Sequence, residues 1–251
     1  MVERNRGAVD KAFDLLRAFG EDNSVGLGVS ELARRSGMSK STAFRLLATL
    51  VENGAVQKAG ELYRIGPLFF DIVKSADSPD YNRVGELLTP YLSALFERTR
   101  QTVHLGYLVG TDVVYANKLF SLNPVDAPSR IGGRVPGFCT GVGKAIMAWD
   151  EELIETVIDA GLPQWSTNTI TDPDEFRSVL AKVRKEGVAY DREEVTPGLT
   201  CVAAPIYGLG GQPVAAMSVS GATGVFRPED HILTLKKVAA SASRAYIRAT
   251  K

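Results

Sequence analysis

The Gly-rich stretch at residues 137–144 is the part of the sequence most suited to binding an anion. A phosphate-binding P-loop places four residues between its first glycine and the Gly-Lys pair, and a serine or threonine follows the lysine. Phe138 and Ala145 occupy these two defining positions, so the sequence excludes a nucleotide-binding P-loop. Residues 140–143 still precede a predicted helix, whose free backbone N–H groups can hold a small anion such as a carboxylate. The alternative is that these glycines only form a tight strand-to-helix turn.

Cysteine and histidine side chains that could catalyse a reaction are present, but the sequence does not group them into a catalytic set. A nucleophile at Cys139 or Cys201 would need a base within hydrogen-bond reach. His104 lies in an apolar segment typical of a buried histidine, and His231 begins the terminal helix. An enzyme that turns over a small carboxylate is therefore an alternative function that requires a base the sequence does not reveal.

A predicted helix over residues 39–52 combines an apolar stripe with a face of hydroxyl and basic side chains. The stripe expected to be buried consists of Phe44, Leu47, Leu50 and Val51. Short polar side chains let a helix approach the major groove of DNA, where an arginine can make a bidentate contact to guanine. Basic residues on the preceding helix and the following hairpin would contact phosphates and set the register. The predicted DNA-binding residues are Arg34, Ser39, Lys40, Ser41, Thr42, Arg45, Lys58 and Arg64.

The segments around this helix follow the order of a winged helix-turn-helix. We expect helices over residues 8–19, 31–35 and 39–52 and a β-hairpin with strands at 55–58 and 61–65. Ser30 and Ser39 can cap the second and third helices, and Gly37 lies where the turn between them needs a positive φ. One amphipathic helix alone would indicate only a solvated polar face. The agreement of turn, caps and hairpin favours DNA binding over a winged helix that binds only protein.

Beyond this unit, the spacing predicts a second domain of helices and antiparallel strands. Residues 67–76 are expected to form a connecting helix, which the sequence Asp77-Ser78-Pro79-Asp80 interrupts. The second domain has expected helices at 87–98, 144–149, 173–186 and 228–248 and expected strands at 102–109, 113–119, 188–191, 200–207 and 213–220. Antiparallel hairpins mixed with helices indicate an α+β fold and not a doubly wound sheet.

The composition is that of an ordinary globular protein, with 29 basic and 29 acidic side chains among 251 residues. Zero net charge argues against a nucleic-acid partner, but residues 33–64 hold six basic residues against two acidic ones, which allows a local basic patch. Cys139 and Cys201 are too few for a disulfide framework and are not spaced as metal ligands. Because the sequence shows neither a long apolar run nor a secretion signal, we expect a cytoplasmic protein with no membrane contact.

Residues 30–47, SELARRSGMSKSTAFRLL, resemble the helix-turn-helix signature of the IclR family of bacterial transcription regulators. Later segments agree with the family in order: TVHL at 102–105, GGRVP at 132–136, TGVGKA at 140–145, GLTCVAAPI at 198–206 and AMSVSG at 216–221. The resemblance implies a winged helix-turn-helix domain at residues 1–66, a linker helix at 67–80 and a GAF-like effector-binding domain at 81–251. It also implies a homodimer, which can pair into a homotetramer, and a response to small metabolites. We expect neither a cofactor nor a metal ion.

The resemblance further implies an effector pocket in the second domain. Its positions correspond to Gly141, Val142, Asp191, Cys201, Ser218 and Ser220. Ser218 and Ser220 are two residues apart on one strand, so their hydroxyls face the same side, opposite the helix that follows residue 140. The alternatives are that the serines are only small core residues and that Asp191 pairs with Arg192 or caps a loop. We therefore expect a transcription regulator whose operator affinity changes when a small carboxylate binds.

Overall fold

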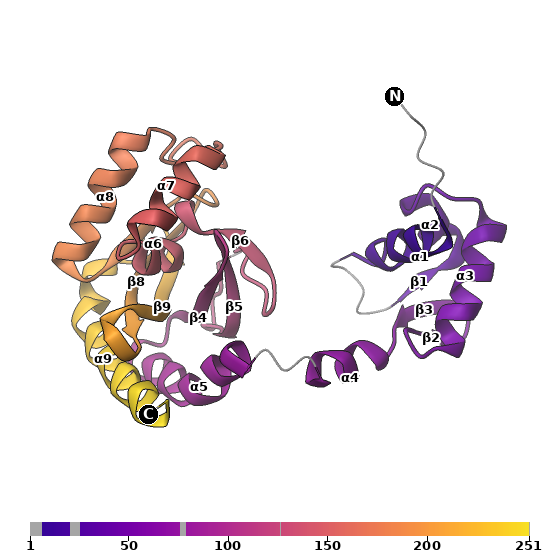
Figure 1. Ribbon diagram of the computed structural model, residues 1–251, viewed down its shortest axis with the longest axis horizontal. Coiled ribbons are helices and arrows are strands. Elements are labelled where there is room, and N and C mark those ends of the chain that lie inside the picture. The colour runs from indigo at the N-terminus through magenta and orange to yellow at the C-terminus, as the bar shows by residue number, and fades with distance from the viewer. Residues whose placement is uncertain (1–6, 21–25, 76–78, 126, 251) are drawn as a thin grey trace. The chain divides into compact units, whose positions relative to one another are not determined.

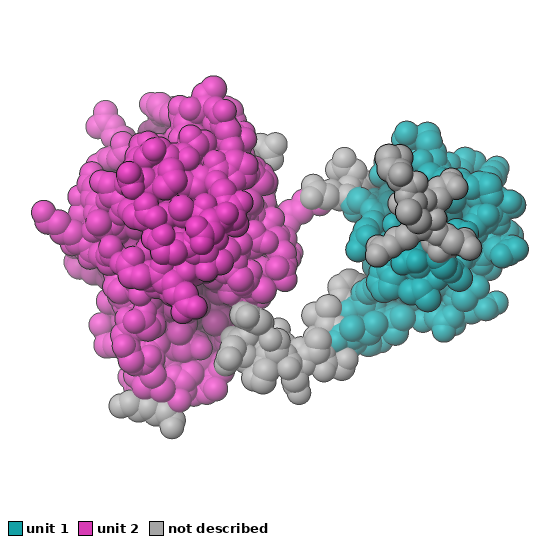
Figure 2. All heavy atoms as spheres, turned by 45° about the horizontal axis from the view of Figure 1, so that its top comes forward, with its two compact units in different colours: residues 1–77 teal, residues 78–251 magenta. Residues whose placement is uncertain are grey.

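The computed structural model describes residues 7–20, 26–75, 79–125 and 127–250, which form two compact units. The first unit comprises Met1–Asp77 and the second Ser78–Lys251 (Figure 2). Helix α4 (Leu68–Ser75), the connecting helix expected from the sequence, groups with the first unit. The predicted break at residues 77–80 lies partly outside the described residues, and Pro79 already begins the next helix.

The first unit is a helix-turn-helix followed by a β-hairpin (Figure 1). Its elements are α1 (Ala8–Arg17), β1 (Leu27–Gly28), α2 (Val29–Arg35), α3 (Lys40–Glu52), β2 (Val56–Ala59) and β3 (Leu62–Ile65), with antiparallel strands in the order β1-β3-β2. The predicted cap of α3 is confirmed, because the Ser39 side chain accepts the backbone N–H of Thr42. Gly37 has the expected positive φ of 66°. The predicted cap of α2 is wrong, since that helix begins at Val29 after an extended Gly28.

The buried stripe of α3 differs from the expected one at Phe44. Ala43 and Leu47, one turn apart, are fully buried, whereas the Phe44 side chain is 53% exposed. Successive residues of a helix differ by about 100° in direction, so burying Ala43 turns Phe44 away from the core. The sequence pattern gives most weight to large apolar side chains and therefore predicted Phe44 in the core. In the structure, the small Ala43 side chain occupies the core position instead. An aromatic ring is therefore exposed on the same helix as the predicted DNA contacts.

The second unit is a curled antiparallel sheet between two layers of helices (Figure 1), which confirms the α+β class. The strands, in the order β6-β5-β4-β9-β8-β7, are β4 (Thr102–Val109), β5 (Asp112–Leu119), β6 (Arg134–Pro136), β7 (Ala189–Arg192), β8 (Leu199–Tyr207) and β9 (Pro213–Ala222). The helices are α5 (Pro79–Thr99), α6 (Gly141–Met147), α7 (Glu151–Ala160), α8 (Pro173–Glu186) and α9 (Ile232–Ala249), with short 3-10 turns η1 (Gly137–Cys139), η2 (Leu209–Gly211) and η3 (Pro228–His231).

Each face of this sheet has its own hydrophobic core. Val103 and Leu105 of β4 pack with residues of α5 and α9 on one face. The opposite face carries α6, whose Val142 packs in a second cluster together with residues of α7 and α8. Because strand side chains alternate between faces, His104, which lies between Val103 and Leu105, points toward the α6 side. Over the part of the chain that the structure describes, no helix is long and apolar enough to cross a membrane.

Candidate functional site

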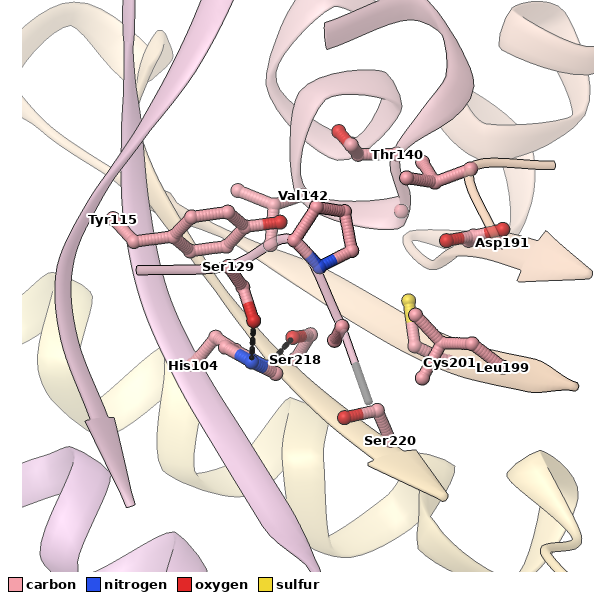
Figure 3. Close-up of a pocket in the computed structure, with 14 residues that line it drawn as sticks. His104, Tyr115, Ser129, Thr140, Val142, Asp191, Leu199, Cys201, Ser218 and Ser220 are labelled. Carbon is pink, nitrogen blue, oxygen red and sulfur yellow. Dashed lines mark hydrogen bonds between the residues drawn. The ribbon is translucent and has the colours of Figure 1, made fainter. Parts of the chain in front are cut away.

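Two neighbouring cross-strand rows place polar side chains on the sheet face beneath α6. In one row, Asp191 of β7 pairs with Cys201 of β8, which pairs with Ser220 of β9. In the next row, Ser218 of β9 pairs with His104 of β4. Directly paired residues of antiparallel strands point to the same face of the sheet. These strands therefore bring side chains far apart in the sequence to one place (Figure 3).

A small cavity lies between these rows and the start of α6, and all six residues implied by the family resemblance line it. They are Gly141, Val142, Asp191, Cys201, Ser218 and Ser220. The cavity measures about 20 Å³, which is room for about one water molecule. The structure thus brings the predicted effector residues together, and their role in binding stays a prediction.

The cavity also has lining residues that the sequence analysis missed, among them His104, Tyr115 and Ser129. His104 could have been found by alternation, because it belongs to a predicted strand and its odd-numbered neighbours are apolar. No comparable pattern in the sequence indicates that Tyr115 or Ser129 lines this cavity. Tyr115 reaches the site through the pairing of β5 with β4, and Ser129 reaches it from the loop after β5.

His104 is buried, as predicted, and both ring nitrogens have hydroxyl partners. Nε2 lies 2.8 Å from the Ser129 oxygen, and Nδ1 lies 3.2 Å from the Ser218 oxygen (Figure 3). Burial, together with the positive charge of Lys118, lowers the pKa of His104 to about 3. The imidazole is therefore neutral at physiological pH and serves as a hydrogen-bonding group of the wall.

The thiols near the cavity are not activated for nucleophilic attack. Burial, reinforced by the nearby carboxylate of Asp191, raises the pKa of Cys139 to about 12 and also raises that of Cys201. A thiol with a raised pKa stays protonated and reacts slowly. Among the described residues around this cavity, neither cysteine therefore supports the alternative of a cysteine-dependent enzyme.

The start of α6 packs tightly against the sheet. The Thr140 hydroxyl accepts the backbone N–H of Gly143 at 2.9 Å and so caps the helix. A Cβ atom on Gly141 would come within 2.7 Å of the Cys201 sulfur, so a larger residue at this position would require the Cys201 side chain to shift. The backbone N–H of Gly143, one of the donors predicted to hold a carboxylate, therefore already donates to the Thr140 hydroxyl.

A buried charge cluster lies beside the cavity. Lys144, the lysine of the Gly-Lys pair, is 1% exposed and forms an ion pair with Glu194, so it is not presented to a phosphate. Asp191 is 3% exposed, and its carboxylate accepts the backbone N–H of Glu194 at 2.8 Å, so Asp191 caps the loop after β7 and also lines the cavity. Burial raises the pKa of Asp191 to about 7, while Lys144 opposes that shift.

The raised pKa of Asp191 predicts a pH-dependent stability of the second unit. The unfolded carboxyl titrates near 3.8 and the folded one near 7, so the folded state holds the extra proton between these values. The contribution of this group is fully present below about pH 4 and is lost as the pH rises toward 7, with a slope of at most about 1.4 kcal/mol per pH unit. Urea unfolding of the wild type and of Asp191→Asn between pH 4.5 and 8 measures it. Identical pH dependences in the two proteins would contradict the assignment.

The predicted DNA-binding residues lie on the surface of the first unit. Arg34, Ser39, Lys40, Ser41, Arg45, Lys58 and Arg64 are exposed, and Thr42 is half-buried. Arg34 donates two hydrogen bonds to Glu31, at 2.9 and 2.6 Å. An exposed ion pair of this kind is worth little, so a DNA phosphate can replace the carboxylate. Contact of these residues with DNA stays a prediction.

Comparisons with known proteins assign both units to one family. Residues 8–60 match the IclR helix-turn-helix domain, and residues 80–245 match the bacterial transcriptional regulator IclR C-terminal domain. The HTH-type transcriptional regulator KdgR of Escherichia coli is 34% identical over 227 residues, which cover 88% of this chain and 84% of KdgR. The transcriptional repressor IclR of the same organism is 32% identical over 220 residues, which cover 85% of this chain and 79% of that repressor.

Solved structures agree with this assignment. The IclR protein of Thermotoga maritima has a TM-score of 0.77 at 30% identity, and the match covers 96% of this chain and 97% of that one. An IclR homologue of Microbacterium hydrocarbonoxydans has a TM-score of 0.81 at 22% identity, covers 97% of this chain and 100% of its own, and shows the common fold. Both units match in the same order over nearly the whole chain. The chain therefore belongs to the IclR family of bacterial transcriptional regulators.

Proposed function

We propose that this regulator binds operator DNA through α3 and the β2–β3 wing and that a small carboxylate bound beneath α6 changes its operator affinity. The observation that carries the proposal is the single cavity lined by Gly141, Val142, Asp191, Cys201, Ser218 and Ser220. These residues come from α6 and from three strands, β7, β8 and β9, so a ligand bound among them would contact both the helix and the sheet.

A carboxylate ligand is supported by the chemistry of this interior. The neutral His104 ring and the hydroxyls of Ser218 and Ser220 line the cavity and supply hydrogen-bonding groups to it. The Microbacterium hydrocarbonoxydans homologue was crystallised in complex with 4-hydroxybenzoate, a hydroxylated carboxylate. We extend this ligand class to the present chain as part of the proposal.

The proposed regulator acts as a homodimer, which can pair into a homotetramer, and its second unit is an effector-sensing domain of GAF-like type. In a dimer, two copies of α3 must meet two half-sites at a fixed spacing on DNA. A ligand that shifts the second unit by a small amount can change that spacing and hence the affinity for the operator. The place of action is the cytoplasm, where the chromosomal operator lies.

The serine hydroxyls of β9 test the proposed pocket. We expect Ser218→Ala and Ser220→Ala each to weaken effector binding about fivefold to tenfold, since each removes one hydrogen-bonding group worth about 1 kcal/mol. Operator binding without effector should change less than about twofold. Effectors are first found by screening central-metabolism and aromatic carboxylates for a saturable rise in melting temperature.

Operator affinity with and without the effector is then measured for each serine variant. Equal losses of bare operator binding and of effector response would mean that the serines are structural. Such a result would contradict their role in the pocket.

A further inference from the structure

Among the described residues of the first unit, Phe44 of α3 lies outside the hydrophobic core. The half-buried side chains of Leu46, Leu50 and Val51 pack against that core, whereas Phe44 is 53% exposed. A single exposed apolar side chain is common on protein surfaces and by itself indicates nothing. What distinguishes Phe44 is its position among the polar and basic side chains of α3.

The surface neighbours of Phe44 include side chains predicted to contact DNA. Residues three and four apart on a helix are neighbours, and for Phe44 these include Lys40, Ser41 and Ala48, which are all exposed. Arg45, also exposed, follows directly in the chain. A recognition helix contacts base edges with its N-terminal residues, and Phe44 lies four residues after Lys40, where α3 begins. Phe44 therefore belongs to the part of α3 that the proposed function places against the base pairs.

The hydroxyl groups at the start of α3 already take part in hydrogen bonds with one another. The Ser39 oxygen lies 3.1 Å from the Ser41 oxygen and 2.8 Å from the Thr42 oxygen. A base edge must therefore share these hydroxyls with their present partners. The phenyl ring of Phe44 has no polar group, so it can meet an apolar group of the DNA without rearrangement of these hydrogen bonds.

The apolar group that base pairs present in the major groove is the 5-methyl group of thymine, and phenylalanine is one of the side chains that suits it. Lys40 and Arg45 place positive charge on either side of Phe44 in the sequence. Charged side chains are depleted at the centre of protein–protein interfaces, whereas basic ones contact the phosphates of DNA. Charge complementarity therefore favours a DNA base over a second copy of this chain as the partner of the ring.

We infer that Phe44 is a specificity-determining residue that contacts the 5-methyl group of one thymine in each operator half-site. Successive Cα atoms lie about 3.8 Å apart and successive base pairs about 3.4 Å apart. The thymine is therefore expected within about two base pairs of the base that Arg45 contacts. This inference rests on the proposed function, which places α3 on the operator without assigning any base to Phe44.

Deoxyuridine, which pairs as thymidine does but lacks the methyl group, tests this contact. Each thymine of an operator selected from a random duplex pool is replaced in turn, and binding of the full chain is measured by fluorescence anisotropy. We expect one position in each half-site at which the replacement weakens binding by about fourfold, the effect typical of burying one methyl-sized group. Phe44→Ala should weaken binding to the thymine operator and abolish this difference, while Phe44→Leu should retain part of it.

Phe13→Ala is the matched control, because Phe13 of α1 is 54% exposed and Phe44 is 53% exposed. This control should keep the full ratio of thymine to deoxyuridine affinity, whatever its effect on the affinity itself. A reciprocal test places cytosine or 5-methylcytosine at the sensitive position. The wild type should bind the methylated duplex about fourfold more tightly, and Phe44→Ala should bind both duplexes equally.

Failure of this inference and failure of the proposed function give different results. If no deoxyuridine replacement weakens binding of the wild type, or if Phe44→Ala keeps the same sensitive position, the role of Phe44 is overturned and operator binding through α3 stands. Loss of self-association by Phe44→Ala in analytical ultracentrifugation, without any deoxyuridine effect, would instead assign the ring to a contact between copies. If the wild type binds no duplex, the operator-binding part of the proposed function falls, and this inference falls with it.

Discussion

The double substitution Lys40→Ala with Arg45→Ala is expected to weaken binding of the full chain to its operator by at least about a hundredfold. A bidentate arginine contact to a guanine contributes about 1–3 kcal/mol, and a lysine contact to a phosphate adds to it. A hundredfold change corresponds to about 2.7 kcal/mol, which these two contacts can supply. Both residues are exposed on α3, so the melting temperature of the first unit should stay nearly constant.

Fluorescence anisotropy on an operator selected from a random duplex pool measures this loss. The salt dependence separates the two contacts, because loss of the lysine contact should reduce the slope of log K against log salt by about one. Lys185→Ala, at an exposed position of α8, is the control. Unchanged operator binding by the double variant would contradict DNA contact through α3 and would favour a winged helix that binds protein instead of DNA.

The substitution Gly143→Ala is expected to destabilise the second unit by about 3 kcal/mol or more, the upper end of the cost of overpacking. A Cβ atom on Gly143 would overlap the backbone of Gly137, including its carbonyl oxygen. Backbone atoms cannot swing aside as a side chain can, so η1 and the start of α6 would have to separate. Because this turn places Gly141 and Val142 in the cavity wall, effector binding should be lost together with stability.

A second glycine of the same unit provides the matched control. Gly85 lies inside α5, and a Cβ atom there would meet only the Ala116 side chain at an ordinary 3.9 Å. Gly85→Ala should therefore raise stability by about 0.5–1 kcal/mol, because alanine loses less conformational freedom than glycine in a helix. Urea unfolding of both variants checks the pair. Equal effects of the two substitutions would contradict the packing described for the start of α6.

The elements predictable from the sequence are those specified by local chemistry. Asp172 accepts the backbone N–H of Glu175 at 2.8 Å to begin α8, and Gly187 ends that helix with a φ of 68°, as its caps predicted. In the helix-turn-helix, Ser39 caps α3 and Gly37 has the positive φ that the turn before α3 needs, as the sequence predicted. Each of these signals operates within a few residues, so one sequence is enough to find it.

The features that the sequence did not reveal depend on contacts between distant segments. Phe44 is exposed because Ala43, and not Phe44, packs with Leu47 in the core of the first unit. The packing of α3 against the other elements of this unit determines which of the two residues is buried. The six effector residues followed from the family resemblance, but His104 and Ser129 meet only because β4 and the loop after β5 fold together.

Control of DNA binding by the pocket is tested by measuring operator affinity with and without a saturating carboxylate that raises the melting temperature of the wild type. We expect the carboxylate to change the operator affinity of the wild type by at least about fivefold, within the usual range of coupling between two sites. We also expect a Ser218→Ala and Ser220→Ala double variant to keep the bare operator affinity and to lose that change. A wild type whose operator affinity stays the same at saturating carboxylate would contradict the claim that this pocket controls DNA binding.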